Sequence, residues 1–300
     1  MQAWIRAHPD AALSRFCNRG RWDSMTLRGR EAIGGFFLTG DAEAVRLWPP
    51  GPAGYGLEFD AHPAAVMRAD PVNLSPSADK LILNQIRFPD LMPEDAAALV
   101  ETIDQSVATT GAGLHRGGSG HWYLTLGEAP DSRWWSPAEV EGRHVLEFMP
   151  RGPGCARLNA LITEIQMLLH DHPINQRRAE EGLLAINSVW PWGWSSPPVM
   201  STSPNLQARL LSTDVYIQGL EQLATAPAAA DADELAVVAS MPGEDSGDFF
   251  ARLEREWAAS LFEDLRRGRI SGATIAVTDG DCVTISRLDL LKFWRRGARS

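Results

Sequence analysis

Residues 155–194 read CARLNALITEIQMLLHDHPINQRRAEEGLLAINSVWPWGW, and this stretch decides the fold. Its first apolar residues recur at i, i+3, i+4 and i+7, which is the spacing of an amphipathic helix with one face in a core. Pro173 disfavours helical backbone at the residue before it, so this helix is predicted to end about two residues earlier. A second helical turn is predicted over 178–181, ended by Gly182, and a short buried strand over 185–190. The apolar face of the first helix consists of Leu158, Leu161, Ile162, Ile165, Leu168 and Leu169.

Helices and strands alternate along the rest of the chain. Pro93 followed by two acidic residues predicts a helix that continues to about Val107. Apolar spacing predicts another helix over 247–268, and residues 272–287 (GATIAVTDGDCVTISR) predict an antiparallel hairpin. This alternation indicates an α/β protein whose mixed, mostly parallel sheet is flanked by helices, with the hairpin at its C-terminal end.

The sequence suggests three segments. Residues 1–66 have little readable pattern, residues 67–198 form an α/β core, and residues 199–300 complete the same globular unit. The Pro/Gly-rich run PPGPAGYG at 49–56 predicts a loop, and Asp70 with Pro71 predicts a turn between two short strands.

Composition excludes several classes of protein. A chain of 300 residues with 44% hydrophobic residues can bury a large core. A net charge of −10 disfavours direct binding to nucleic acid or to an anionic membrane. Three widely spaced cysteines outside any CxxC pattern indicate buried free thiols in a reducing compartment. With no run of about 18 apolar residues and no apolar signal region at the start, we expect a soluble cytoplasmic protein.

Polar donors gather around two proline turns. Arg68, Asp70 and Asn73 surround the first turn, and a second group follows Pro173. Arginine guanidinium groups bind phosphate or carboxylate through paired hydrogen bonds, so the two groups together predict an anion or ligand site. The alternative is structural: Asp70 pairs with Arg177 or Arg178 across the core. The complete candidate set is Arg68, Asp70, Asn73, Asn175, Arg177, Arg178, Asn187, Trp190 and Trp192.

A metal site is a weaker interpretation of the same region. His170 and His172, with Glu164 and Asp171, offer imidazole and carboxylate ligands. Ligands at i and i+2 near a helix end point in different directions, however, and histidines there can instead cap the C-terminus of the helix. The glycine-rich loop 111–120 could likewise cradle an anion through its backbone N–H groups, or be a mobile hairpin loop. No G-x-S-x-G, phosphate-loop or G-x-G-x-x-G pattern occurs, so we assign no catalytic residue, metal site or cofactor.

Several segments in order resemble a known family. RADPVNLSPSADKLIL (68–83), TEIQMLLHDHPINQRR (163–178) and AINSVWPWGW (185–194) resemble the bacterial RpfE-type regulatory proteins, which are often labelled cofactor-independent phosphoglycerate mutase-like. HPINQRR and AINSVWPWG are also similar to archaeal-type phosphoglycerate mutases of the alkaline-phosphatase superfamily.

The resemblance implies a fold of the alkaline-phosphatase and phosphoglycerate-mutase type. Those mutases use a serine nucleophile and two divalent metals, whose ligands include a C-terminal cluster with histidine. Here no histidine follows His172. The resemblance therefore implies a non-catalytic regulatory or partner-binding protein, a pseudoenzyme that keeps an anion site. Its expected partners are another protein, such as a nuclease of DNA metabolism, and a phosphorylated small molecule. The alternative is a metal-dependent phosphoryl-transfer enzyme.

Overall fold

A computed structural model of the 300-residue chain describes twelve stretches of backbone. They are residues 2–24, 50–61, 63–86, 90–128, 135–152, 154–194, 208–211, 215–216, 218–219, 233–236, 245–276 and 281–291. None of the helices in these stretches has the length and apolar character needed to cross a membrane.

The chain forms two compact units. One consists of residues 1–36 together with 238–300, and the other of residues 37–237. Each unit is described by itself below. This division differs from the boundaries predicted at residues 66 and 198, because residues near the two ends of the chain pair in one sheet.

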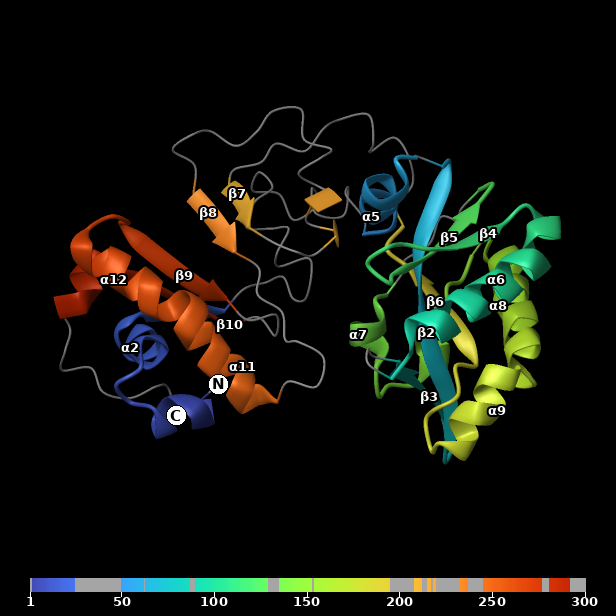
Figure 1. The fold of residues 1–300 in the computed structure, drawn as a ribbon, viewed down its shortest axis with the longest axis horizontal. Coiled ribbons are helices and arrows are strands. Elements are labelled where there is room, and N and C mark those ends of the chain that lie inside the picture. The colour runs from blue at the N-terminus through green and yellow to red at the C-terminus, as the bar shows by residue number, and fades with distance from the viewer. Residues whose placement is uncertain are drawn as a thin grey trace. The chain divides into compact units, whose positions relative to one another are not determined.

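The larger unit is built on a five-stranded antiparallel sheet in which the long strand β2 is central (Figure 1). β2 pairs with β3 and β5, and β6 also pairs with β2. β4 pairs with β5 at the edge. The strands are β2 (Ala65–Ser77), β3 (Lys80–Gln85), β4 (Gly113–Arg116), β5 (Trp122–Leu126) and β6 (Ser188–Trp192).

The predicted mostly parallel sheet is therefore wrong. β2 and β3 are joined by a tight turn, and a short loop joins β4 to β5; neighbouring strands joined by short connections run antiparallel. Parallel pairing occurs between β7 (Ala208–Leu211) and β8 (Asp233–Ala236), a separate two-stranded pair.

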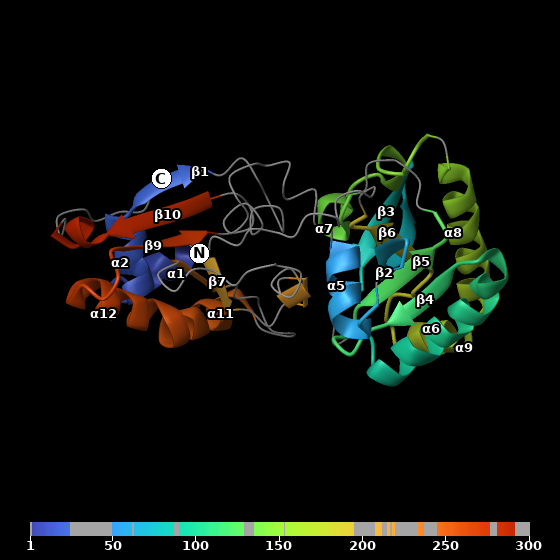
Figure 2. The same ribbon diagram turned by 90° about the horizontal axis from the view of Figure 1, so that it is seen from above.

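Helices cover both faces of this sheet. Figures 1 and 2 show α6, α8 and α9 on one side of β2, and α5 and α7 on the other. The helical elements are α5 (Pro50–Phe59), α6 (Pro93–Val107), η1 (Ala108–Thr110), α7 (Pro137–Val140), η2 (Val145–Glu147), α8 (Cys155–His170) and α9 (Pro173–Glu180). The helix predicted from residue 155 and the one predicted from Pro93 to Val107 are confirmed.

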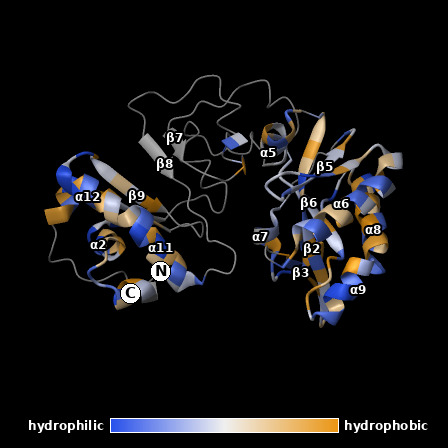
Figure 3. Ribbon diagram, viewed as in Figure 1, coloured by the Kyte–Doolittle hydropathy of each residue, from blue (hydrophilic) through white to orange (hydrophobic). Residues whose placement is uncertain are grey.

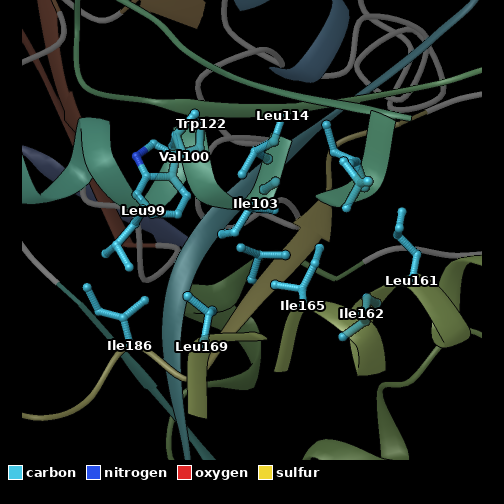
Figure 4. Close-up of a cluster of buried hydrophobic side chains, with 14 of the residues drawn as sticks. Leu99, Val100, Ile103, Leu114, Trp122, Leu161, Ile162, Ile165, Leu169 and Ile186 are labelled. Carbon is cyan, nitrogen blue, oxygen red and sulfur yellow. The ribbon is translucent and has the colours of Figure 1, made fainter. Parts of the chain in front are cut away.

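The main core lies between α6, α8 and the sheet. Figure 4 shows Leu99 and Ile103 of α6 in the same cluster as Ile165 and Leu169 of α8, with Trp122 of β5 beside them. The four aliphatic side chains are fully buried, whereas polar residues lie on the outer face of α8. Figure 3 shows hydrophobic and hydrophilic residues along this helix. The apolar periodicity thus identified the buried face of α8 correctly.

Two loop predictions near the start of this unit are wrong. Residues 49–56 were expected to form a loop, but α5 begins at Pro50. Proline suits a first helical turn, and the glycines allow close packing: a Cβ on Gly51 would lie 2.7 Å from the Val66 carbonyl oxygen. The turn expected at Asp70 and Pro71 is the middle of β2, because proline and the residue before it both favour extended backbone.

The smaller unit joins both ends of the chain. Its three-stranded antiparallel sheet has the order β1-β10-β9, and the predicted C-terminal hairpin strands are confirmed. Glu254 accepts hydrogen bonds of 2.7 Å from the backbone nitrogens of Ala12 and Leu13, which connects the two chain ends. The elements are α1 (Gln2–Ala7), α2 (Ala12–Arg19), β1 (Arg21–Ser24), α11 (Ser246–Leu253), the π-helical η4 (Glu254–Ala258), α12 (Ala259–Arg267), β9 (Gly272–Ala276), β10 (Asp281–Ser286) and η5 (Arg287–Leu291).

The three cysteines are buried, as the sequence indicated. Burial raises the pKa of the Cys17 thiol to about 12, so this side chain behaves as an apolar core residue at neutral pH.

Candidate functional site

The nine candidate residues do not form one site. Arg68, Asp70 and Trp192 form one buried cluster on the face of β2 that is opposite to the main core. Asn73, Asn175, Arg178 and Asn187 bond to backbone groups of the chain around β6 instead. The remaining two, Arg177 and Trp190, have separate partners.

Strand register explains why Arg68 is buried. Arg68 is paired with Tyr123 of β5 on one side and with Trp192 of β6 on the other. Its guanidinium carbon lies 5.6 Å from the centre of each ring, so the cation is held between two aromatic faces. Its side chain is only 5% exposed and forms a 2.5 Å ion pair with Asp70.

Asp70 is an ionised carboxylate in this cluster. One carboxylate oxygen accepts from Arg68 and the other accepts a 2.7 Å hydrogen bond from Trp192 Nε1. Burial by itself would raise the pKa of Asp70, but the attraction of Arg68 and these two hydrogen bonds outweigh it, with a smaller contribution from His121. The pKa of Asp70 therefore lies below its usual value.

One buried polar atom of this ion pair, Arg68 Nε, has no hydrogen-bond partner among the residues that the structure describes. Tyr123 Oη and Glu58 Oε2 are buried next to each other, where the phenol can donate to the carboxylate. Burial raises the pKa of the Tyr123 phenol, and the hydrogen bond and charge of Glu58 add to this effect, so the phenol is a hydrogen-bond donor at neutral pH. Unpaired buried polar groups are rare in proteins, and one next to a charged pair is a candidate place for a polar ligand.

The second set of candidates holds the backbone of residues 184–187. Asn175 accepts from Ile186 N and donates to Ile186 O, both at 2.8 Å. Asn73 donates to Ala185 O and Arg178 Nε donates to Leu184 O. Asn187 forms two hydrogen bonds with the Leu74 backbone, which attaches this segment to β2. These side chains bond to backbone groups of the chain itself, and their role in ligand binding stays a prediction.

The structural alternative is also wrong in its partners. Asp70 pairs with Arg68, whereas Arg177 forms a 2.5 Å ion pair with Asp95 at the surface. Arg178 is buried and donates to the backbone oxygens of Leu184 and Asp90. Trp190 Nε1 donates a 2.8 Å hydrogen bond to the Trp135 carbonyl oxygen.

Arg177→Ala and Arg178→Ala are expected to differ sharply, although the two residues are neighbours. Arg178→Ala removes charged hydrogen bonds and leaves two carbonyl groups unpaired, which costs about 2–3 kcal/mol of unfolding free energy. Arg177→Ala breaks an exposed ion pair and should leave the urea midpoint unchanged within error. Equal midpoints for the two variants would contradict the structural role of Arg178.

The two histidines do not face a common ligand. His170 lies in the last turn of α8, and its side chain is 82% exposed. His172 is the N-cap of the following helix, where its Nδ1 accepts from Ile174 N at 3.2 Å. Within the described stretches, no group of three or more histidine, cysteine, aspartate or glutamate side chains is placed to hold a metal ion. His172 is thus a capping residue, as one interpretation expected, but it caps the start of α9 and not the end of α8. α9 begins at Pro173, five residues earlier than the predicted start at residue 178.

His172 should make stability depend on pH. Burial lowers the pKa of His172, so the unfolded chain takes up a proton more readily than the folded chain. The contribution of the cap, about 1 kcal/mol, is complete above pH 6.5 and is lost as the pH falls through the lowered pKa of the folded state. His172→Asn keeps an acceptor that does not titrate, so it should lose less stability than the wild type in urea unfolding between pH 7.5 and 5. His170→Asn is the control and should follow the wild type.

Sequence reasoning missed Tyr123 and Glu58. Neither residue was in the candidate set, and Glu58 follows the segment predicted as a loop. The glycine-rich loop connects them: residues 113–116 form β4, and Ser119 N, in the turn that follows, donates a 2.8 Å hydrogen bond to Glu58 Oε1. A Cβ on Gly117 would lie 2.0 Å from Glu58 Oε2, so only glycine allows this approach. The loop interpretation holds for the turn, and its anion-cradle alternative stays a prediction.

The region of this chain that is similar to known proteins contains most of the Arg68 cluster. Residues 52–175 match the family model of 2,3-bisphosphoglycerate-independent phosphoglycerate mutase. A probable mutase of this kind from Geobacter sulfurreducens is 29% identical over 151 residues, which are 50% of this chain and 38% of that protein. The mutase of Methanosarcina barkeri is 30% identical over 107 residues, 35% of this chain and 27% of that protein.

These matches support the resemblance to phosphoglycerate mutases for the region from α5 to the start of α9. This chain spans well under half the length of the curated relatives it matches. The solved structure of cofactor-independent phosphoglycerate mutase from Thermoplasma acidophilum aligns with 93% of this chain and 82% of that chain, at a TM-score of 0.40 and 15% identity.

Proposed function

We propose that the region similar to phosphoglycerate mutases is a non-catalytic binding module of a regulatory protein, and that its ligand is a phosphorylated small molecule. The observation that carries the proposal is the buried donor Arg68 Nε, which has no partner in the described part of the chain and lies on the residue of β2 that is paired with Tyr123 of β5. A phosphoryl oxygen would satisfy this donor, and the Tyr123 phenol could turn from Glu58 to the same oxygen.

The charges of the cluster fit this role. Arg68 is already paired with Asp70, and the Glu58 carboxylate lies beside Tyr123, so the cluster has no excess positive charge and does not attract every anion. A ligand must replace some of the interaction with Asp70, and a doubly charged phosphoryl group can do so because guanidinium binds phosphate through two hydrogen bonds. Asp70, with 22% of its side chain exposed, is the member of the ion pair that reaches solvent.

The regulatory part of the proposal rests on charge and on the RpfE-type resemblance. With a net charge of −10, the chain is expected to act through another protein and not through direct contact with nucleic acid or an anionic membrane. A cytoplasmic nuclease of DNA metabolism is the partner class that this resemblance favours.

The alternative is a metal-dependent phosphoryl-transfer enzyme. The similarity to proteins named as mutases favours it. The candidate residues do not support it, because Asn73, Asn175, Arg178 and Asn187 all bond to the protein backbone and do not converge on a reacting group.

Tyr123→Phe tests the binding site with the smallest change. It removes one buried hydroxyl and keeps the ring against Arg68. We expect the free energy of unfolding of the free protein to stay the same or rise by up to about 1 kcal/mol, and the affinity for 3-phosphoglycerate to fall about tenfold in calorimetric titration.

Tyr55→Phe is the matched control, since Tyr55 is a buried tyrosine of α5 whose ring meets that of Tyr123 edge to face. It should bind 3-phosphoglycerate like the wild type. Unchanged affinity in Tyr123→Phe would show that this hydroxyl does not contact the ligand.

A further inference from the structure

A cavity lies beside the N-terminal half of α8, against the main core. Its volume is about 180 Å³, which exceeds the roughly 150 Å³ of a protein cavity that holds benzene. It shares no residue with the Arg68 cluster. The residues that line it include Leu126 of β5, Glu128, and Arg157, Leu158, Leu161 and Glu164 of α8.

The charges on this wall are of both signs. Arg157 donates through Nη2 to the Thr110 carbonyl oxygen, which fixes the guanidinium at the rim and leaves its other N–H groups without a partner in the described residues. Glu164 uses Oε1 to accept a 3.1 Å hydrogen bond from Ser106 Oγ. Its Oε2, and both carboxylate oxygens of the exposed Glu128, have no hydrogen-bond partner within the stretches described.

The rest of the wall is apolar. Leu158 and Leu161 are buried, Leu126 is half-buried, and the three side chains belong to or pack against the main core. A ligand that fits must therefore present a cation to the carboxylates, an anion to the guanidinium and a hydrocarbon group to the leucines. A ligand with only one charge would pair with one sign of this wall and leave the other to water, whereas a ligand with both charges can pair with both.

We propose that this cavity binds a free α-amino acid with an apolar side chain. Its ammonium group is held by Glu128 and Glu164, its carboxylate by Arg157, and its side chain lies against the leucines. The site is distinct from the proposed phosphoryl-ligand site, so the chain can respond to two kinds of small molecule.

The test titrates the full chain with L-leucine, L-methionine and L-valine by calorimetry, and compares L-leucine with two analogues that each lack one charge. L-leucinamide keeps the ammonium group and 4-methylpentanoate keeps the carboxylate. We expect at least one amino acid to bind, and each analogue to bind at least about tenfold more weakly than L-leucine. Absence of binding by all three amino acids, or equal binding of L-leucine and L-leucinamide, would overturn the proposal.

Variants locate the site. Glu164→Gln preserves an acceptor for Ser106 and removes the charge, and Ala160→Phe fills the cavity from an exposed position on α8. Both should weaken L-leucine binding about tenfold or more while the circular dichroism spectrum stays native. Glu101→Gln, an exposed position on α6 outside the cavity, should bind like the wild type. Full affinity in Ala160→Phe would place any amino-acid binding elsewhere and contradict the assignment of this cavity.

Discussion

Ile165→Asp is expected to unfold the α/β region, at a cost of at least about 4 kcal/mol. Ile165 of α8 is fully buried against α6 in an apolar cluster, whose described members include no cation to pair with a carboxylate. Urea unfolding followed by far-ultraviolet circular dichroism would show the loss directly.

Met167→Asp provides the matched control on the same helix. Met167 is 71% exposed, so the same carboxylate stays in water and should shift the free energy of unfolding by no more than about 0.5 kcal/mol. A native urea midpoint for Ile165→Asp would refute the packing of α8 described above.

Arg68→Met is expected to lower the free energy of unfolding by about 3–5 kcal/mol at neutral pH, since it leaves the Asp70 carboxylate buried without its cation. Asp70→Asn in the same chain should recover part of this loss, because the Trp192 N–H can donate to an amide oxygen. The comparison of the two single variants with the double variant measures the coupling between Arg68 and Asp70.

The loss of unfolding free energy caused by Arg68→Met should become smaller as the pH falls. In the wild type the pKa of Asp70 is lowered from 3.8, so its stabilising contribution is present above pH 3.8 and is lost as the pH falls through the lower pKa of the folded state. Without Arg68, burial raises that pKa, and protonation relieves the unpaired charge. A deficit that stays constant from pH 7 to pH 3.5 would mean that Asp70 is not the group left unpaired.

The parts of the fold that could be predicted are those with a strong local pattern. α6 and α8 were identified from apolar spacing and from Pro93 at the first turn, and the strands of the C-terminal hairpin from their β-branched residues. Strand direction in the larger sheet could not be found this way, because pairing depends on contacts between residues far apart in the chain. β2 continues through Pro71 since β6 pairs with it there on one side, while β5 and β3 pair with residues before and after Pro71.

The Arg68 cluster was found in the sequence only in part, because it too depends on pairing between distant strands. Arg68, Asp70 and Trp192 were in the candidate set and do lie together. Tyr123 joins them through strand register, which the sequence does not show. A sequence also cannot tell whether an asparagine amide faces a ligand or a backbone group, and Asn175 proved to do the latter.

The central claim is that the region similar to phosphoglycerate mutases binds a phosphorylated molecule without catalysing its conversion. Calorimetric titration of the metal-stripped full chain with 3-phosphoglycerate, with and without Mn²⁺ or Zn²⁺, tests it most directly when the product mixture is assayed for 2-phosphoglycerate. The account predicts binding in the absence of metal and no 2-phosphoglycerate under either condition. Binding that requires the metal, together with formation of 2-phosphoglycerate, would contradict it and establish the enzyme.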